Sequence, residues 1–262
     1  MLKHIRASRR GFDAVDDWSD LDLVADLKAR VTLGYAALRT VDSITANTRV
    51  TAERLPRVGG TVSIVPNGVD VRRFHDALPQ RPAGIPEGQF AVYAGVIQER
   101  IDVDLLCRVA RTSKIPVVVA GGGDESILAE LQSAGVFTLG RLDHELVPGL
   151  LKSAAVGLLP HRIMPLTESM DPLKLLEYLA AGLPVVATPL PGVEISDRVL
   201  VASTPERFAQ AIADAAAIGV SSTPDPAVRL RDWSRQAQAL LDAHLRRTEI
   251  SRPSTDDAEV TP

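Results

Sequence analysis

The sequence predicts an α/β fold in which a parallel β-sheet is covered by helices on both faces. Two observations predict it. From about residue 60 onward, short β-rich runs alternate with segments of helical periodicity. Most of these runs are continuously apolar, which is typical of parallel strands buried on both faces. The 262-residue chain is 45% hydrophobic but only 4% aromatic, so we expect a core built mainly from Val, Leu, Ile and Ala.

The expected elements follow one another at regular intervals along the chain. The expected strands are 61–66, 89–95, 115–121, 136–140, 154–160, 183–188 and 198–203, and the expected helices are 102–112, 124–134, 143–152, 172–181 and 205–217. A long amphipathic helix is expected over 225–247, because its apolar positions lie three and four residues apart.

The two ends of the chain differ from this pattern. The first 57 residues contain two helical stretches around one short strand, roughly 42–47, which are too few strands to close a sheet. The final stretch, 249–262, is polar and contains two prolines, so we expect it to be disordered.

Composition excludes several classes of function. A net charge of −4 argues against non-specific binding of nucleic acid. Cys107 is the only cysteine, which rules out an intrachain disulfide. No apolar run reaches the roughly 18 residues of a membrane span, and no apolar segment follows the basic N-terminus. We therefore expect a cytoplasmic protein, with peripheral contact to the inner face of the membrane left open.

The stretch MDPLKLLEYLAAGLPVVATPLPG, 170–192, raises the main functional hypothesis. Asp171 is a good N-cap and Pro172 suits the first position of a helix. Lys174 then places a positive charge in the first turn, where a cation is unfavourable unless an anion binds there. Glu177 lies one turn further on the same face, where a carboxylate can accept both hydroxyls of a ribose. Phosphate and ribose together indicate a nucleotide; the alternative is a surface ion pair contributing about 0.2–0.5 kcal/mol.

Other loops carry weaker signals. In AGGGDES, 120–126, the glycines permit close backbone approach, or the loop is a tight turn with Asp124 as helix cap. Arg100 could contact a phosphate or be a solvated charge, and Asp102 is interpreted as a cap. His161 follows a strand and could line a cleft or be a polar loop residue. NGVDVRRF, 67–74, is interpreted as a turn. No metal spacing appears among the five histidines.

In order along the chain, these segments resemble the C-terminal half of a GT-B glycosyltransferase. The resemblance rests on IVPNGVDVRRF, YAGVIQERIDVDLL, VVVAGGGDESILAEL, VFTLGRLDHELVPGLLKSAAVGLLP and LTESMDPLKLLEYLAAGLPVVATPLPGV. The last of these is similar to the donor-binding segment of the branch that builds bacterial cell-surface polysaccharides. The resemblance extends from about residue 11 to 247 and implies one Rossmann-like half of a GT-B enzyme.

The resemblance also implies roles for particular residues. It assigns Glu177 to the ribose, Lys174, Arg100 and Gly95 to the donor diphosphate, Gly140, Arg141 and Leu142 to the flanks of the base, and Thr167, Ser169 and Asp171 to the vicinity of the donor sugar. It implies no metal and no cofactor other than the substrate nucleotide sugar.

This sequence departs from the family pattern in three ways. Ser169 stands where many relatives have a glutamate, with Glu168 adjacent, and Val96 stands where many have an arginine. FDAVDDW near the start is similar to a segment late in the family's N-terminal domain, most of which, about 150 residues for a typical domain, is absent. We therefore expect 1–57 to be a remnant of the acceptor domain, 58–222 the donor-binding domain and 223–248 a crossover helix.

The predicted function is transfer of a sugar, of the hexosyltransferase type, from a nucleoside-diphosphate sugar to a glycan or lipid-linked acceptor. A separately encoded N-terminal half is a possible partner, and no general base is assigned. Two alternatives remain: a truncated relative that only binds a nucleotide sugar or a partner protein, and a sugar-nucleotide epimerase relying on His161 and Glu168.

Overall fold

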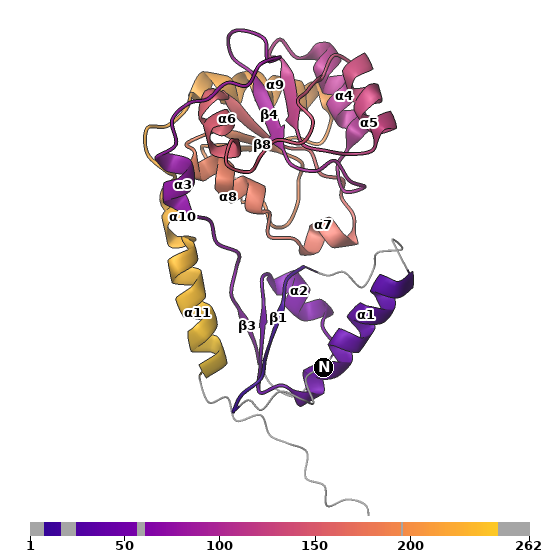
Figure 1. Cartoon of the computed structure of the whole chain (residues 1–262), viewed down its shortest axis with the longest axis vertical. Coiled ribbons are helices and arrows are strands. Elements are labelled where there is room, and N and C mark those ends of the chain that lie inside the picture. Colours follow the sequence, from indigo (N-terminus) through magenta and orange to yellow (C-terminus); the bar gives the residue numbers. More distant parts are fainter. Residues whose placement is uncertain (1–7, 17–24, 57–60, 195, 246–262) are drawn as a thin grey trace, which may run out of the picture.

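The computed structural model describes residues 8–16, 25–56, 61–194 and 196–245. Two units lie one above the other and are joined on one side by two crossover segments (Figure 1). The larger unit contains a six-stranded sheet and the smaller unit a three-stranded sheet. The tail predicted to be disordered, 249–262, lies outside the described residues.

The six-stranded sheet is parallel throughout, as the continuously apolar runs predict. Its strand order is β6-β5-β4-β7-β8-β9, so the chain order reverses between β4 and β7. This is the doubly wound Rossmann order, and its reversal point is where such sheets bind ligands. The strands are β4 (Ala91–Ala94), β5 (Val117–Ala120), β6 (Phe137–Thr138), β7 (Val156–Leu159), β8 (Val185–Ala187) and β9 (Val199–Val201).

Helices cover both faces of this sheet because its strands are apolar on both sides. On β4, Val92 and Ala94 pack into one core, and Ala91 and Tyr93 pack into the other. The first core is closed by α3 (Val71–His75), α6 (Val147–Ser153), α8 (Leu173–Ala180) and α10 (Pro226–Leu230). The second is closed by α4 (Val103–Thr112), α5 (Glu125–Ser133) and α9 (Pro205–Ile218). The α/β class is therefore confirmed.

The smaller unit holds a parallel sheet in the order β1-β2-β3. Its strands are β1 (Gly11–Ala14), β2 (Ser43–Ala46) and β3 (Val62–Ile64), and its helical segments are α1 (Ala25–Ala36), the 3-10 turn η2 (Ala37–Thr40) and α2 (Arg49–Arg54). Ile44 and Ala46 of β2 pack against Leu38 and Leu55 in a small core of their own. The alternation of SITA thus places apolar side chains on one face and hydroxyls on the other.

Two expectations for this unit need correction. β1 was not predicted, and it supplies the third strand of the sheet. β3 pairs with β2, so it belongs to the smaller unit, although the boundary expected at residue 58 assigned it to the larger one. The reason is that a three-residue apolar strand carries no signal for which sheet it joins.

The expected helix over 225–247 is broken into α10 and α11 (Trp233–Leu245). The break occurs where Val69 of the first crossover segment pairs with the second: its N–H donates to the Arg231 carbonyl at 2.8 Å, and its carbonyl accepts from the Trp233 N–H at 3.1 Å. Asp232 then bonds the Ser234 N–H at 3.0 Å. The helix predicted from periodicity is therefore interrupted where the two crossover segments pair through their backbones.

Helix α11 returns to the smaller unit and covers the polar face of its sheet (Figure 1). Nδ1 of His244 lies 2.7 Å from Oγ of Ser43, and Nε2 lies 3.4 Å from Oγ1 of Thr45. A Cβ at Gly11 would lie 2.5 Å from Nδ1 of His244, so a larger residue here would displace the imidazole ring from its place against the sheet. The crossover helix therefore closes the sheet that the first residues form.

Direct contacts also join the two units opposite the crossovers, where α2 meets α7 (Pro165–Ser169). The hydroxyls of Thr48 and Thr51 both donate to the Ser169 carbonyl, at 2.9 and 3.1 Å. Arg54 forms an ion pair with Glu168 at 2.9 Å. The units are thus connected at both sides of their junction.

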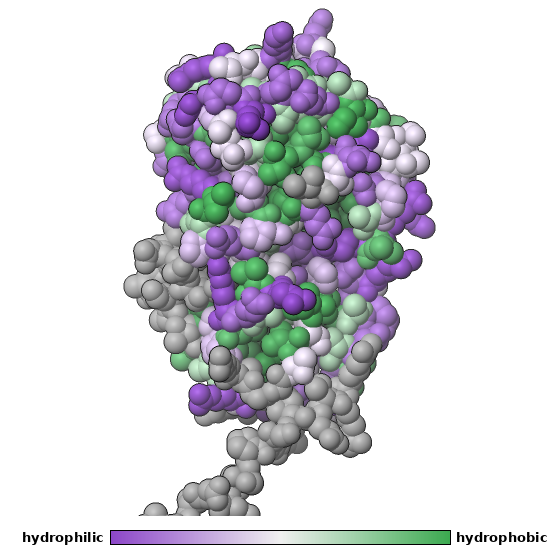
Figure 2. Space-filling view, turned by 180° about the vertical axis from the view of Figure 1, so that it is seen from behind, coloured by the Kyte–Doolittle hydropathy of each residue, from purple (hydrophilic) through white to green (hydrophobic). Residues whose placement is uncertain are grey.

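The surface is mixed in character. Figure 2 shows hydrophobic patches in both units, separated by hydrophilic side chains. Within the described residues, no helix is both long enough and apolar enough to cross a membrane.

Arg231 ties the crossovers to the larger unit. Its Nε donates to the Asn67 carbonyl at 2.8 Å, and its guanidinium pairs with the Asp171 carboxylate, which is only 11% exposed. We predict that Arg231→Ala destabilises the protein by about 1.5–3 kcal/mol, because it leaves a largely buried carboxylate without its cation. Thermal unfolding should show a fall of roughly 3–12 °C.

Arg111→Ala is the matched control, because Arg111 is exposed in the last turn of α4. It should change stability by less than about 0.5 kcal/mol. Equal melting temperatures for Arg231→Ala and the control would contradict the role assigned to this ion pair.

Candidate functional site

The candidate site lies at the reversal point of the six-stranded sheet, beyond the carboxyl ends of β4 and β7. Gly95 follows β4 directly, and its N–H donates to the Ala120 carbonyl at 2.9 Å. His161 follows β7, with Pro160 between them. Helix α8 begins beside this edge. The fold therefore places the predicted glycine loop and the predicted lysine–glutamate helix where open α/β sheets bind ligands.

Lys174, Glu177 and Gly95 lie together. Nζ of Lys174 is 3.0 Å from Oε2 of Glu177, and the two side chains are 32% and 17% exposed. A Cβ at Gly95 would lie 3.2 Å from Cε of Lys174 and 2.8 Å from the Tyr93 hydroxyl. The lysine stem therefore passes over the glycine loop, and its ammonium group reaches the carboxylate one turn along α8.

The first turn of α8 is not capped as the sequence predicted. Asp171 is not the N-cap: its carboxylate accepts from the Asn67 N–H at 2.7 Å and pairs with Arg231. The cap position is Pro172, and no side chain bonds the helix there. The Leu175 N–H donates to the Pro172 carbonyl at 3.1 Å, while no side chain caps the N–H groups of Leu173 and Lys174. The positive partial charge of this helix end adds to the charge of Lys174. An anion is the natural partner for such a helix end.

The second glycine loop packs tightly against the first. A Cβ at Gly121 would lie 1.8 Å from the Gly95 carbonyl oxygen, and one at Gly123 would lie 2.9 Å from Cβ of Ile97. Asp124 caps α5 by accepting from the Ser126 N–H at 2.9 Å, as predicted. These glycines therefore serve backbone packing between the loops.

The predicted base-flanking segment lies beside these loops. Cβ of Arg141 is 4.0 Å from the position of a Cβ at Gly122. Gly140 has φ of +65°, which explains the glycine there. Leu142 is half-buried against the core that α8 closes. The assignment of these three residues to the base stays a prediction.

Two of the residues predicted near the donor sugar have their hydroxyls engaged elsewhere. Thr167 is fully buried; its hydroxyl donates toward the Arg162 and Met164 carbonyls and accepts from the Met164 N–H. Ser169 is also buried, and its hydroxyl donates to the Leu166 carbonyl at 2.8 Å. Both side chains thus shape the loop and helix α7, because their short side chains bond the backbone nearby.

Arg100 and His161 form a polar pair that the sequence treated separately. The Arg162 N–H donates to the Arg100 carbonyl at 2.8 Å, which ties the two loops together. Nε of Arg100 and Nδ1 of His161 are both buried without a hydrogen-bond partner in the described part of the chain. Burial, assisted by the nearby Arg100 charge, lowers the pKa of His161 to about 4. His161 is therefore a neutral imidazole at pH 7.

Asp16 is a site residue that sequence analysis did not single out. It has φ of 59°, the only positive value at a non-glycine residue among those described. Asn47, itself buried, donates from Nδ2 to the Asp16 carboxylate at 2.7 Å and accepts from the Asp16 N–H at 3.3 Å. Burial raises the pKa of Asp16, and the negative charge of Asp171 raises it further. The hydrogen bond from Asn47 and the charge of Arg100 lower the pKa, but the net shift is upward.

The Asp16 carboxylate thus lies at the carboxyl end of β1, within electrostatic reach of the larger unit. The only sequence signal was its place in FDAVDDW, where three aspartates have no distinguishing spacing. Strained backbone and a shifted carboxylate at an interdomain junction are features of functional sites.

No group of three or more His, Cys, Asp or Glu side chains among the described residues could hold a metal ion.

Comparison with known proteins identifies a family match and similar folds. Residues 89–217 match the family described as glycosyl transferases group 1. This segment is therefore similar to glycosyltransferases of that group, and its fold is the one found in solved GT-B structures. The match spans the six-stranded sheet from before β4 to the end of α9.

A curated relative is TuaH of Bacillus subtilis (strain 168), whose name proposes a glycosyltransferase of teichuronic acid biosynthesis. It is 26% identical over 200 residues, which are 69% of this chain and 50% of TuaH. The chain therefore spans about half the length of this relative.

Solved GT-B structures share the fold of both units. HepE of Anabaena, crystallised with UDP and glucose, has a TM-score of 0.66 at 15% identity, covering 88% of this chain and 70% of HepE. Sucrose-phosphate synthase of Thermosynechococcus elongatus has a TM-score of 0.63 at 19% identity, covering 82% and 60%. The comparisons give no support to the epimerase alternative.

The GT-B domain holds a histidine whose ionisation should destabilise it. Because the folded pKa of His161 is about 4 and an unfolded histidine titrates near 6.5, protons bind the unfolded chain first as the pH falls. Stability should fall between pH 6.5 and 4 by an amount on the order of 3 kcal/mol. Thermal unfolding against pH, for wild type and His161→Gln, measures it: the difference between the two should shift in favour of the variant as the pH falls.

A difference between wild type and His161→Gln that stays constant from pH 7 to pH 4 would contradict the neutral buried state assigned to this imidazole.

Proposed function

We propose that the chain binds a nucleoside-diphosphate sugar at the reversal point of its large sheet and acts in transfer of that sugar to a glycan or lipid-linked acceptor. The observation that carries this proposal is the grouping of Gly95, Lys174 and Glu177 at an uncapped end of α8. Such a group offers a cation, a helix end that no side chain caps and a carboxylate within one helical turn. A nucleotide has the complementary parts, a diphosphate and a ribose.

Each residue has a separate task in this proposal. Lys174 and the amides of α8 bind the diphosphate, and they stabilise the negative charge that grows on it as the bond to the sugar breaks. Glu177 accepts hydrogen bonds from the ribose hydroxyls. Gly95 leaves the space through which the lysine stem reaches the phosphates. Arg100 is a second candidate cation, because its loop adjoins the same edge.

The ion pair between Lys174 and Glu177 has a consequence for binding. In the structure the ammonium group is neutralised by the carboxylate 3.0 Å away. A diphosphate that approaches must share this ammonium, while the ribose hydroxyls replace it as partners of the carboxylate. Both residues are thus held in place before a ligand binds, which lowers the entropic cost of binding.

The relatives suggest which ligands to test first. HepE was crystallised with UDP and with UDP-glucose, so uridine diphosphate is the first nucleotide to test. The name of TuaH concerns teichuronic acid biosynthesis, which supports an acceptor of the glycan class. The acceptor, a partner supplying the remainder of an acceptor domain, and a cytoplasmic site of action stay predictions.

The test is a thermal-shift panel with UDP, GDP, dTDP, ADP and their sugars. The proposal predicts that one nucleotide, at about 100 times its Kd, stabilises the wild type by about 2.7 kcal/mol, or roughly 5–11 °C. Lys174→Ala and Glu177→Gln should abolish this shift, because each removes one of the two groups that hold the ligand.

Lys114→Ala and Glu87→Gln are matched controls, since both residues are exposed and stand before β5 and β4, at the amino ends of the strands rather than at the carboxyl ends where the site lies. They should keep the full shift. A folded protein that no nucleotide stabilises, or a shift that survives in both site variants, would overturn the proposal. A shift without sugar transfer would favour a nucleotide-binding relative instead.

A further inference from the structure

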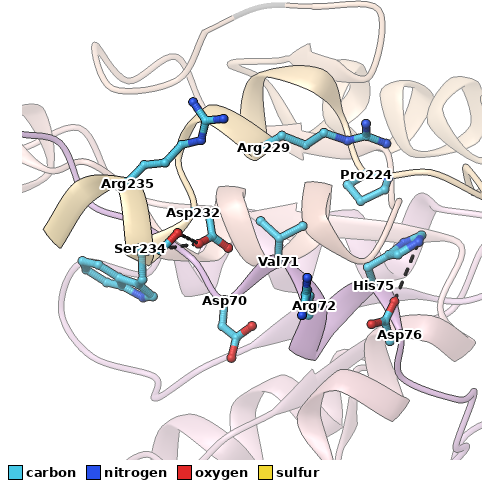
Figure 3. Close-up of a pocket in the computed structure, with 11 residues that line it drawn as sticks. Asp70, Val71, Arg72, His75, Asp76, Pro224, Arg229, Asp232, Ser234 and Arg235 are labelled. Atoms are coloured by element: carbon cyan, nitrogen blue, oxygen red, sulfur yellow. Dashed lines mark hydrogen bonds and ion pairs between the residues drawn. The ribbon is translucent and has the colours of Figure 1, made fainter. Parts of the chain in front are cut away.

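A second hollow lies at the crossovers, on the side of the molecule where α3, α10 and α11 meet (Figures 1 and 3). Its volume is about 820 Å³, and we call it the hinge hollow. It shares no lining residue with the Gly95, Lys174 and Glu177 group. Three arginines line it, from three different elements: Arg72 of α3, Arg229 of α10 and Arg235 of α11.

Two of the three carboxylates of the hinge hollow, those of Asp70 and Asp232, already have donors. Asp70 accepts from the Arg73 N–H at 3.1 Å and caps α3. Asp232 accepts from the N–H and hydroxyl of Ser234, at 3.0 and 2.5 Å, and these bonds lower its pKa. The third, Asp76, lies 4.0 Å from Nε2 of His75. Asp70 and Asp232 therefore hold the walls of the hollow.

The arginine side chains of the hinge hollow have fewer partners than its carboxylates. In the described part of the chain, the guanidinium groups of Arg229 and Arg235 have no hydrogen bond or ion pair, although the backbone N–H of Arg235 donates to the Asp232 carbonyl at 3.0 Å. The charge of Arg72 acts on Asp232 at longer range and lowers its pKa. Figure 3 shows Arg229 and Arg235 along one side of the hollow, Asp70 and Asp76 along the other, and Asp232 between Arg235 and Asp70. One side thus presents guanidinium donors without acceptors, which is the arrangement that carboxylates and phosphates bind best.

Trp233 adds a flat apolar surface beside these donors. A Cβ at Gly68 would lie 2.7 and 2.8 Å from two carbons of its indole ring, so the ring packs directly on the backbone there. Trp233 nevertheless remains 48% exposed and lines the hollow. An indole held in place in this way can stack against the C–H face of a sugar ring.

We propose that the hinge hollow binds an anionic saccharide, with its sugar ring against Trp233 and its carboxylate or phosphate oxygens on Arg229 and Arg235. The chemistry needed is a negatively charged group on a sugar, because the free groups of the hollow are donors beside an aromatic surface. This site is separate from the donor site; it rests on the proposed function only in that a glycosyltransferase handles glycans. A growing acidic glycan held here would remain attached to the enzyme between transfers.

The test is calorimetric titration with a tetramer of galacturonate, a neutral maltotetraose, a sugar phosphate and inorganic phosphate. The double variant Arg229→Gln/Arg235→Gln should bind the anionic saccharides at least tenfold more weakly than wild type. Arg111→Gln/Arg207→Gln is the control: it makes the same change of charge on exposed residues outside the hollow. It should bind as wild type does.

Fluorescence locates the binding independently. The chain has two tryptophans, so in a Trp18→Phe background the emission reports Trp233 alone. Anionic saccharide should change this emission, and maltotetraose should not. Equal weakening in the two double variants, an unchanged emission, or binding of phosphate or maltotetraose as tight as galacturonate would each overturn the inference, as would no binding of any anionic saccharide.

The nucleotide response keeps the two proposals apart. The Arg229→Gln/Arg235→Gln variant should retain the full nucleotide shift, because neither residue lies in the donor site. Loss of saccharide binding with a retained nucleotide shift supports this inference. A wild type that binds a nucleotide but no anionic saccharide overturns the inference and leaves the proposed function intact.

Discussion

The carboxylate of Asp171 is the constraint on which the junction of this molecule depends. It is largely buried, so it requires partners, and it finds them in two crossover segments far away in sequence: Asn67 and Arg231. A buried carboxylate of this kind fixes geometry because leaving any of its partners unpaired is costly. The start of α8, the chain entering the larger unit and the chain leaving it are thereby held in one arrangement.

This arrangement has a direct effect on the candidate site. Because Asp171 bonds the crossovers, it does not cap α8, and no side chain bonds the first amides of that helix beside Lys174. Asp171 therefore stabilises the junction instead of capping α8, and the start of α8 can bind a ligand. The same carboxylate lies close enough to Asp16 to affect its pKa, so the smaller unit, the junction and the donor edge interact electrostatically.

Close backbone packing is the second condition for the site. The contact between Gly121 and the Gly95 carbonyl brings the loops after β4 and β5 together, and no side chain fits between them. The lysine stem then has a defined path over Gly95. On the opposite side of the junction, Gly68 has the same effect for the ring of Trp233. In both candidate binding regions, the missing side chain of a glycine lets a neighbouring group pack directly on the backbone.

The sequence by itself determined the features that depend on local periodicity and local backbone chemistry. Continuously apolar runs predicted β4 to β9, helical spacing predicted the main helices of the larger unit, and Asp102 and Asp124 were recognised as caps because their partners lie two or three residues away. The spacing of Lys174 and Glu177 predicted their contact for the same reason.

Tertiary structure alone decided the features that depend on partners distant in sequence. These are the sheet that β3 joins, the break between α10 and α11, the engagement of the Thr167 and Ser169 hydroxyls and the position of Asp16 against Asn47. The role of Asp171 is the clearest example: locally it had the character of a cap, but Asn67, 104 residues before it, and Arg231, 60 residues after it, offered bonds to a carboxylate that packing had removed from water. Periodicity records which side chains are buried, but the partners of a buried polar group are known only once the chain has folded.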